Sequence, residues 1–142
     1  MGIDILKSKL KEHGKRITPQ RIVVYNTLKE STIHPNAEEL HQEIIKKHPN
    51  ISLATVYQIL NLFEDELRIV KSISTNHIKH YDIRSEFHIH TICPKCGEIE
   101  DIYSDKIKLF WENLIEELRL KPEDQIIKIY QVCSACSKKK EI

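Results

Sequence analysis

The feature that most constrains this chain is a pair of C-x-x-C motifs. Cys93 and Cys96 form the first motif, Cys133 and Cys136 form the second, and together they are the 4 cysteines of the chain. Thiol pairs at this spacing are typical of four-cysteine zinc sites, in which one metal ion joins two turns. Two disulfides or a redox-active dithiol would use the same residues, but structural disulfides are rare in a reducing compartment. The cysteines therefore favour a small domain closed by structural Zn(II).

Composition indicates a globular chain. Its 142 residues are 40% hydrophobic and 30% charged, which is enough for one ordinary domain or two small ones. No apolar run is long enough for a membrane span or a signal peptide, so we expect a cytoplasmic protein with no membrane partner. The formal net charge of +1 does not by itself indicate a nucleic-acid partner, but residues 1–21 carry six basic and two acidic side chains, a local charge of +4.

The N-terminal half predicts helices followed by a hairpin. Apolar residues recur at three- and four-residue steps over 4–13, 18–30, 36–47 and 52–66. Two of these helices are joined by a tight turn and preceded by another helix, which is the layout of a helix-turn-helix motif. Two β-type runs, 69–74 and 78–83, surround the polar turn 75–77 and predict a hairpin. We therefore expect a winged helix-turn-helix domain over residues 1–83.

Residues 84–142 predict a second, smaller domain. Arg84, Ser85 and Glu86 form a short polar hinge, where we place the boundary. Beyond the hinge, the pattern predicts strands over 87–93, 98–103 and 125–132 and a helix over 105–119. A domain of this size has little core, so we expect the cysteine-bound metal and a subunit partner to help it fold. The expected fold class is α+β, with a winged-helix domain followed by a small α+β dimerisation domain.

The 52–66 helix would present polar groups to DNA if it is the recognition helix. Hydroxyl groups bind phosphates, the Gln58 amide can bind adenine edges, and the Thr55 methyl or the Tyr57 ring can contact thymine methyl groups. Basic residues near the N-terminus would contact phosphates. The alternative is that all of these are ordinary solvated residues of a helical bundle. The candidate DNA-binding residues are Lys15, Arg16, Arg21, Ser52, Thr55, Tyr57 and Gln58.

A second metal site is indicated by His88 and His90. Side chains alternate along a strand, so both imidazoles face the same side, about 6.6 Å apart along the strand, and can reach one ion. Asp82 lies just before them, Asp101 lies on the paired strand, and His34 lies in the N-terminal half. Mixed nitrogen and carboxylate donors suit Fe(II), Mn(II) or Zn(II). Spacing alone does not bring His34 to this set.

Two other functions would use the same residues. A metal-dependent hydrolase needs an open metal position and a general base in a cleft. His88, His90 and Asp82 could be its ligands, but the chain has no motif such as H-E-x-x-H. A zinc-ribbon interaction module would need only the four cysteines, and its histidines would be incidental.

Five motifs, in order along nearly the whole chain, carry a family resemblance. They are Lys15-Arg16-Ile17-Thr18-Pro19-Gln20-Arg21, His34-Pro35, Ser52-Leu53-Ala54-Thr55-Val56-Tyr57, His88-x-His90-x-x-Cys93-x-x-Cys96-Gly97 and Tyr130-x-x-Cys133-x-x-Cys136. Together they resemble the Fur family of metal-dependent repressors. The resemblance implies a transcriptional regulator rather than an enzyme. It implies a homodimer whose winged-helix domains bind a palindromic operator in double-stranded DNA.

The resemblance also assigns metals and two DNA contacts. It implies structural Zn(II) at the four cysteines, a base contact for Tyr57 and a minor-groove contact for Lys15. One segment departs from the family, because Glu64-Asp65-Glu66 stands where a glycine often ends the recognition helix. The regulatory Fe(II) or Mn(II) ligands implied by the resemblance are His34, Asp82, His88, His90 and Asp101.

Within the family, the chain is most similar to the peroxide-sensing PerR subgroup. Asp101 stands where iron-sensing Fur proteins usually have Glu, and Phe87 and Gln125 stand where such proteins tend to have histidines. The resemblance implies peroxide sensing through Fe(II)-catalysed oxidation of a histidine ligand, His34 or His88. The alternative is an iron- or zinc-responsive Fur- or Zur-type repressor without peroxide sensing.

Overall fold

The computed structural model describes residues 2–31, 33–83, 87–122 and 125–138. The chain divides into two compact units, Met1–Arg84 and Ser85–Ile142, and each contains its own sheet. Helices and strands are both present in each unit, which confirms the α+β class. Among the described residues, no helix combines the length and the apolar character that crossing a membrane requires. The predicted hinge, residues 84–86, lies outside the described part of the chain.

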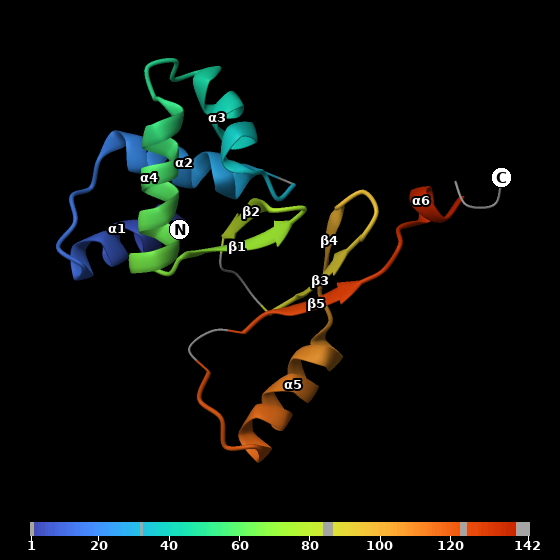
Figure 1. Ribbon diagram of the computed structural model, residues 1–142. Coiled ribbons are helices and arrows are strands. Elements are labelled where there is room, and N and C mark those ends of the chain that lie inside the picture. The colour runs from blue at the N-terminus through green and yellow to red at the C-terminus, as the bar shows by residue number, and fades with distance from the viewer. Residues whose placement is uncertain (1, 32, 84–86, 123–124, 139–142) are drawn as a thin grey trace. The chain divides into compact units, whose positions relative to one another are not determined.

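The first unit is a set of helices followed by a two-stranded hairpin (Figure 1). Strands β1 and β2 pair antiparallel, from Val70 opposite Ile83 to Thr75 opposite Ile78. This is the predicted winged helix-turn-helix order. In sequence, the elements are α1 (Gly2–Glu12), α2 (Pro19–Glu30), α3 (Ala37–Ile45), α4 (Leu53–Asn61), the π-helical turn η1 (Leu62–Glu66), β1 (Val70–Thr75) and β2 (Ile78–Ile83).

Polar caps fix where α2 and α3 begin. Thr18 accepts a hydrogen bond from the Arg21 backbone N–H at 3.2 Å, with proline at the first helical position of α2. Asn36 and Glu39 exchange side-chain-to-backbone hydrogen bonds of 2.7 and 3.1 Å and form a capping box before α3. Each cap satisfies backbone groups that lack a partner inside the helix. The two helices therefore begin where the sequence predicts.

The core of the first unit takes one face from every helix and from the hairpin. Within α4, Val56, Ile59 and Leu60 are buried, whereas Tyr57 and Gln58 are exposed. The Tyr25 and Phe63 rings meet edge to face, 6.1 Å apart. This packing fixes which face of α4 is left for a partner. The fully buried side chains of the unit include Leu6, Leu10, Val24, Val56, Leu60 and Phe63.

The helix predicted over 52–66 is helical as far as Glu66, but its last turn is wider than an α-helical turn. Regular α-helix ends at Asn61, and the widened turn η1 follows, closed by a 2.9 Å bond from the Leu67 N–H to the Leu62 carbonyl five residues back. Arg68, at φ 53°, then turns the chain toward β1. This left-handed conformation is usually taken by glycine. The wide turn and Arg68 together end the helix without the glycine.

The hairpin turn is shorter than predicted, because Thr75 belongs to β1. The two loop residues, Asn76 and His77, have φ values of 53° and 66°. Positive φ at both central positions is the mark of a type I′ turn, whose twist matches that of the flanking strands. The turn therefore gives the wing a fixed register.

The second unit is a three-stranded sheet with one longer helix (Figure 1). Its strand order is β4-β3-β5, with β3 antiparallel to β4 and parallel to β5. The strands are shorter than predicted, and the short helix α6 was not predicted. The elements are β3 (Ile89–Ile92), β4 (Ile99–Ile102), α5 (Asp105–Glu117), β5 (Ile127–Tyr130) and α6 (Ser134–Lys138).

Candidate metal centres and nucleic-acid interface

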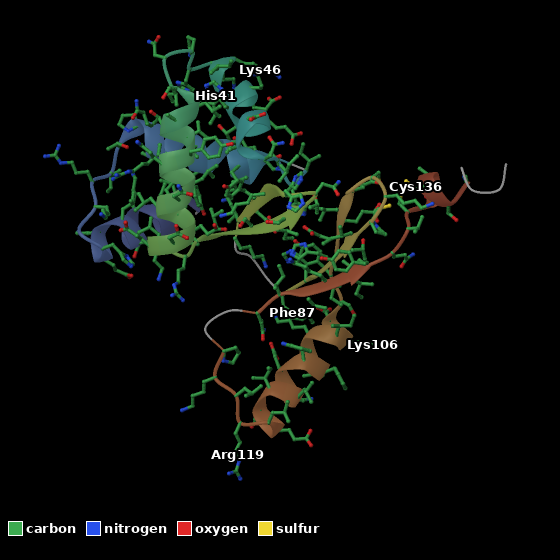
Figure 2. The ribbon with its side chains drawn as sticks, viewed as in Figure 1. His41, Lys46, Phe87, Lys106, Arg119 and Cys136 are labelled. Carbon is green, nitrogen blue, oxygen red and sulfur yellow. The ribbon has the colours of Figure 1, made fainter. Side chains whose placement is uncertain are left out.

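The two cysteine pairs meet at one end of the second sheet. Strands β3 and β5 run parallel, with Ile92 opposite Tyr130, so the residues that follow both strands emerge at the same edge. Cys93 and Cys96 lie in the turn after β3, and Cys133 precedes α6. Cys136 lies within α6 (Figure 2). The four cysteine sulfur atoms all lie within 4.8 Å of one another. The structure thus brings together residues that are far apart in the sequence.

The cysteine geometry fits a tetrahedral zinc site. All four thiols are free, and the Cys96 and Cys133 sulfurs are 3.7 Å apart. Zinc–sulfur bonds of ~2.3 Å place the sulfurs of a tetrahedron about 3.8 Å apart, whereas a disulfide needs about 2.05 Å. Gly97, at φ 77°, lets the chain turn so that its N–H donates to the Cys93 carbonyl at 2.8 Å. The donor set therefore suits structural Zn(II).

The cysteines differ in how readily they ionise. The Cys133 backbone N–H donates to the Cys93 sulfur, which lowers the pKa of that thiol to about 6. The hydrogen bond with the Cys133 thiol, together with burial, raises the pKa of Cys136 to about 12. Four neighbouring thiols cannot all ionise easily, because the thiolates repel one another. A bound cation would compensate this negative charge. Metal binding here releases protons and adds to folding free energy.

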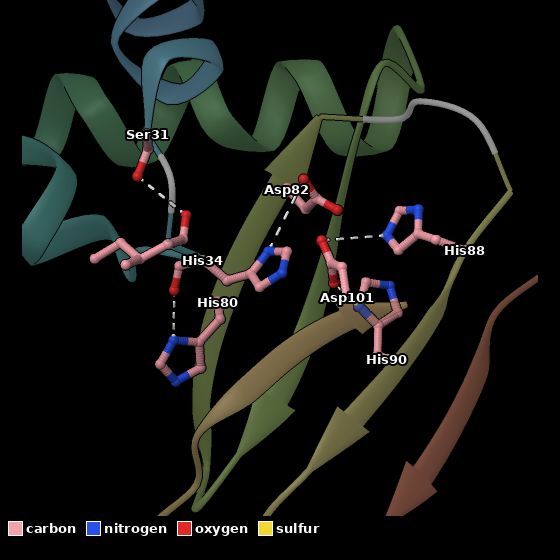
Figure 3. A network of polar contacts seen from close by, with 8 residues as sticks. Ser31, His34, His80, Asp82, His88, His90 and Asp101 are labelled. Carbon is pink, nitrogen blue, oxygen red and sulfur yellow. Dashed lines mark hydrogen bonds and ion pairs between the residues drawn. The ribbon is translucent and has the colours of Figure 1, made fainter. Parts of the chain in front are cut away.

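The second donor set lies on β3 and β4. His90 and Asp101 are directly opposite in the antiparallel ladder, with the His90 Nδ1 2.7 Å from an Asp101 oxygen. His88 precedes the strand, and its Nε2 lies 3.7 Å from the other Asp101 oxygen (Figure 3). The two imidazole rings are 4.4 Å apart and buried, as the predicted alternation requires. Two nitrogens and a carboxylate at this spacing suit Fe(II) or Mn(II).

The other predicted ligands form a pair in the first unit. The His34 Nδ1 lies 3.9 Å from an Asp82 oxygen, and both side chains are largely buried (Figure 3). Two bonds hold the His34 loop against β2: the His80 ring nitrogen lies 2.9 Å from the His34 carbonyl, and the Tyr81 N–H donates to the Pro35 carbonyl at 2.9 Å. The predicted five-residue set is thus built as a pair in the first unit and a triad in the second.

Phe87 and Gln125, where the resemblance to iron-sensing proteins leads us to expect histidines, both contact Trp111. The Phe87 ring stacks on Trp111 at 6.2 Å, and the Trp111 indole N–H donates to the Gln125 side-chain oxygen at 2.7 Å. An aromatic ring and an amide held by tryptophan are poor ligands for a divalent transition metal. These two positions therefore support packing rather than a further metal site.

The candidate DNA-binding residues gather around α4. The Ser52 hydroxyl caps the helix through the Thr55 N–H at 3.1 Å, and Tyr57 and Gln58 are exposed beyond it. A hollow of about 320 Å³ on one side of α4 is lined by Lys15, Thr18, Gln20, Arg21, Thr55, Gln58, Ile59, Leu62 and Glu66. Arg16 is exposed, and its carbonyl accepts a 2.6 Å bond from Arg21. Basic and polar side chains thus lie beside the exposed face of α4.

Sequence reasoning did not single out three charged residues on this side of the unit. Lys79 of the wing lines a hollow of about 290 Å³ together with Tyr57. Glu64 lies 3.3 Å from Lys79, and Glu66 lies 3.3 Å from Lys15. The acidic run 64–66 was noted only as a departure from the family, and no local signal shows which lysines it would meet.

Comparison with known proteins fits this arrangement. The Ferric uptake regulator family matches residues 12–130. The chain is 33% identical to the peroxide operon regulator of Bacillus subtilis over 130 residues, 92% of this chain and 90% of that protein. Its fold is similar to that of the Campylobacter jejuni peroxide stress regulator (TM-score 0.71, 37% identity, 94% and 98% of the two chains). It is also similar to that of the Helicobacter pylori ferric uptake regulator Fur (TM-score 0.76, 28% identity, 95% and 91%). The chain therefore belongs to the Ferric uptake regulator family.

Proposed function

We propose that this member of the family is a metal-dependent transcriptional repressor that senses peroxide through oxidation of a histidine ligand of Fe(II). The observation that carries the proposal is the triad His88, His90 and Asp101, in which a partly buried aspartate faces two buried imidazoles. Relatives named as peroxide regulators, from Bacillus subtilis and Campylobacter jejuni, support it. A transcriptional repressor must be in the compartment that contains its DNA, so the proposed location is the cytoplasm.

The proposed regulatory site combines the triad with His34 and Asp82. Fe(II) and Mn(II) take more donors than either set supplies by itself. One ion bound by both sets would stabilise the arrangement of the two units in which it binds. If that arrangement is also the one that binds DNA, metal and DNA each raise the affinity for the other.

Peroxide would act by changing one ligand. Bound Fe(II) would catalyse cleavage of the peroxide O–O bond beside the ligands, and the two electrons that reduce peroxide would come, in net terms, from the oxidised ring. His34 or His88 would then gain one oxygen atom at a ring carbon, with water as the other product. The oxidised ring is a poorer donor, so the site loses affinity for metal and the protein loses affinity for DNA. Mn(II) would hold the same residues together without this oxidation.

Residues 1–83 are the proposed DNA-binding domain. The exposed side of α4 would enter the major groove, because it presents an amide beside Lys15 and Arg21 and a tyrosine beside Lys79. A homodimer would place two such helices on a palindromic operator in double-stranded DNA. The proposed contacts are Lys15, Arg16, Arg21, Ser52, Thr55, Tyr57 and Gln58.

Residues 84–142 are the proposed metal-binding dimerisation domain. Helix α5 buries no residue within the single chain, and large apolar side chains on α5 and β5 are exposed, for example Phe110 at 66% and Tyr130 at 62%. Exposed apolar groups in this density are typical of a surface that another subunit covers. A second copy of this chain is the proposed partner.

The test of peroxide sensing combines mass spectrometry with DNA binding. Protein loaded with Fe(II) is treated with stoichiometric peroxide, and the peptides containing His34 and His88 are mapped, with Mn(II)-loaded protein as control. We expect one of the two peptides to gain an oxygen atom and operator binding to be lost, in the Fe(II) sample alone. Unchanged peptides with intact operator binding would overturn the proposal.

An iron- or zinc-responsive repressor is the second candidate, supported by the similarity to the Helicobacter pylori Fur fold. The Phe87–Trp111–Gln125 packing counts against a further site of the iron-sensing kind. A titration of operator binding with each metal, before and after peroxide, distinguishes the two candidate functions. A peroxide sensor responds to Fe(II) and Mn(II) and is reversed by peroxide only with Fe(II), whereas a metal sensor keeps binding after peroxide.

A further inference from the structure

Two acidic residues of η1 are paired with lysines that lie toward the proposed DNA-binding side. Glu66 is 3.3 Å from the Lys15 ammonium, and Glu64 is 3.3 Å from the Lys79 ammonium. Lys15 comes from the loop before α2, and Lys79 comes from the wing strand β2. A single turn of chain at the end of the recognition helix thus meets a cation on each of two different elements.

The Lys15–Glu66 pair lies at the border of a polar hollow. The hollow of about 320 Å³ beside α4 is lined by Lys15, Arg21, Thr55 and Gln58 among others, and Glu66 is the acidic residue in its lining. Four of the seven candidate DNA contacts therefore share one depression with a carboxylate. A DNA phosphate that approached Lys15 here would also approach Glu66.

The pair contributes little to folding. The side chains of Lys15 and Glu66 are 38% and 51% exposed, and ion pairs at such exposure are nearly neutral for stability. Their effect on a polyanion is different. A lysine binds DNA by releasing counterions from phosphates, and a lysine already neutralised by a carboxylate must first give up that partner.

We propose that Glu66 restrains DNA binding by holding Lys15 away from phosphates. The inference rests on the proposed DNA-binding function of α4 and adds a regulatory residue to it. Glu66 acts through Lys15 and lowers the electrostatic affinity for any duplex. Stable binding then depends more on the base contacts of α4, since these contacts do not involve Glu66. Glu64 acts in the same sense on Lys79.

The test is the substitution Glu66→Gln in the full chain loaded with Mn(II). The matched control is Glu43→Gln, which removes the carboxylate of another exposed glutamate–lysine pair, Glu43 with Lys46 at 2.8 Å, and changes net charge equally. Binding to a labelled duplex of mixed sequence, and to an operator selected from a random pool, is measured against salt. We expect Glu66→Gln to bind both duplexes several-fold more tightly at low salt than the control. Its slope of log affinity against log salt should be steeper by about 0.9 per chain.

A second variant tests whether the effect passes through Lys15. In a Lys15→Gln background, Glu66→Gln should raise affinity and salt slope much less than it does in the wild-type background, because only direct repulsion between Glu66 and phosphates is left to relieve. An equal gain in that background, or a Glu66→Gln protein that behaves like Glu43→Gln, would overturn the inference and leave the proposed function standing. Wild-type protein that binds no duplex with any metal would instead overturn the proposed function, and the inference with it.

Discussion

His90 and Asp101 show how much depends on one cross-strand pair. Their backbones are paired in the β3–β4 ladder, so the length of each side chain decides where its donor atom can reach. With aspartate at 101, one carboxylate lies 2.7 Å from His90 and 3.7 Å from His88. The position of this carboxylate relative to both imidazoles is therefore set by a single methylene group.

The substitution Asp101→Glu tests that dependence. The added methylene moves the carboxylate and changes the donor set around the ion, so peroxide-driven histidine oxidation should slow several-fold while Mn(II)-dependent operator binding is retained. The rate is measured by mass spectrometry of the Fe(II)-loaded protein. Glu100→Asp, the opposite change at the exposed neighbour, is the control and should oxidise like wild type. Equal peroxide sensitivity in Asp101→Glu would show that Asp101 does not discriminate sensing from metal binding.

At the scale of elements, the turn η1 contributes both a buried side chain to the core and two carboxylates to surface ion pairs. Phe63 is fully buried against Tyr25, while Glu64 and Glu66 of the same turn meet lysines of other elements. The wide turn is held by the Leu62-to-Leu67 backbone bond and followed by the left-handed Arg68. The positions of Glu64 and Glu66 beside their lysines therefore depend on the burial of Phe63.

Phe63→Ala should be strongly destabilising. Loss of a fully buried phenylalanine leaves a cavity and typically costs about 3–5 kcal/mol. Because the first unit is mainly helical, denaturant unfolding followed by far-ultraviolet circular dichroism reports on it. Ile5→Ala, at a side chain that is 54% exposed, should change stability by no more than ~0.5 kcal/mol. Similar midpoints for the two variants would show that Phe63 is not an anchor of the core.

At the scale of the whole molecule, the two units differ in how they are stabilised. The first unit has a continuous apolar core drawn from α1, α2, α3, α4, η1 and the hairpin. Helix α5 of the second unit has no buried residue, and the four cysteines join the segments that follow β3 and β5. The second unit should therefore depend on bound metal more than the first.

Cys133→Ser tests this difference. We expect the variant to lose its zinc and the packing of the second unit, while the helical signal of the first unit remains. Zinc is measured by elemental analysis, and packing is followed through the fluorescence of Trp111, which stacks on Phe87 in the second unit. Ser134→Ala, at the exposed neighbouring residue, is the control. Unchanged Trp111 fluorescence in a zinc-free Cys133→Ser protein would contradict the expected role of the metal.

The sequence by itself determined the features whose causes are local or repeated. Capping residues such as Thr18 and Asn36 act within one turn of their helix, and period-2 alternation places His88 and His90 together. The spacing of the cysteines predicted a shared site for the same reason, since each pair needs only one tight turn. The α+β class and the winged-helix order follow from these patterns.

Only the tertiary structure decided the contacts between distant segments. Glu66 meets Lys15, and Trp111 connects Phe87 to Gln125, because packing brings together elements that no local pattern relates. The end of the α4 helix also depends on tertiary contacts. Its wide turn η1 lies where the buried Phe63 and Leu67 both join the core before the chain enters β1. Local propensity cannot predict such features, because their free energy comes from burial against the rest of the fold.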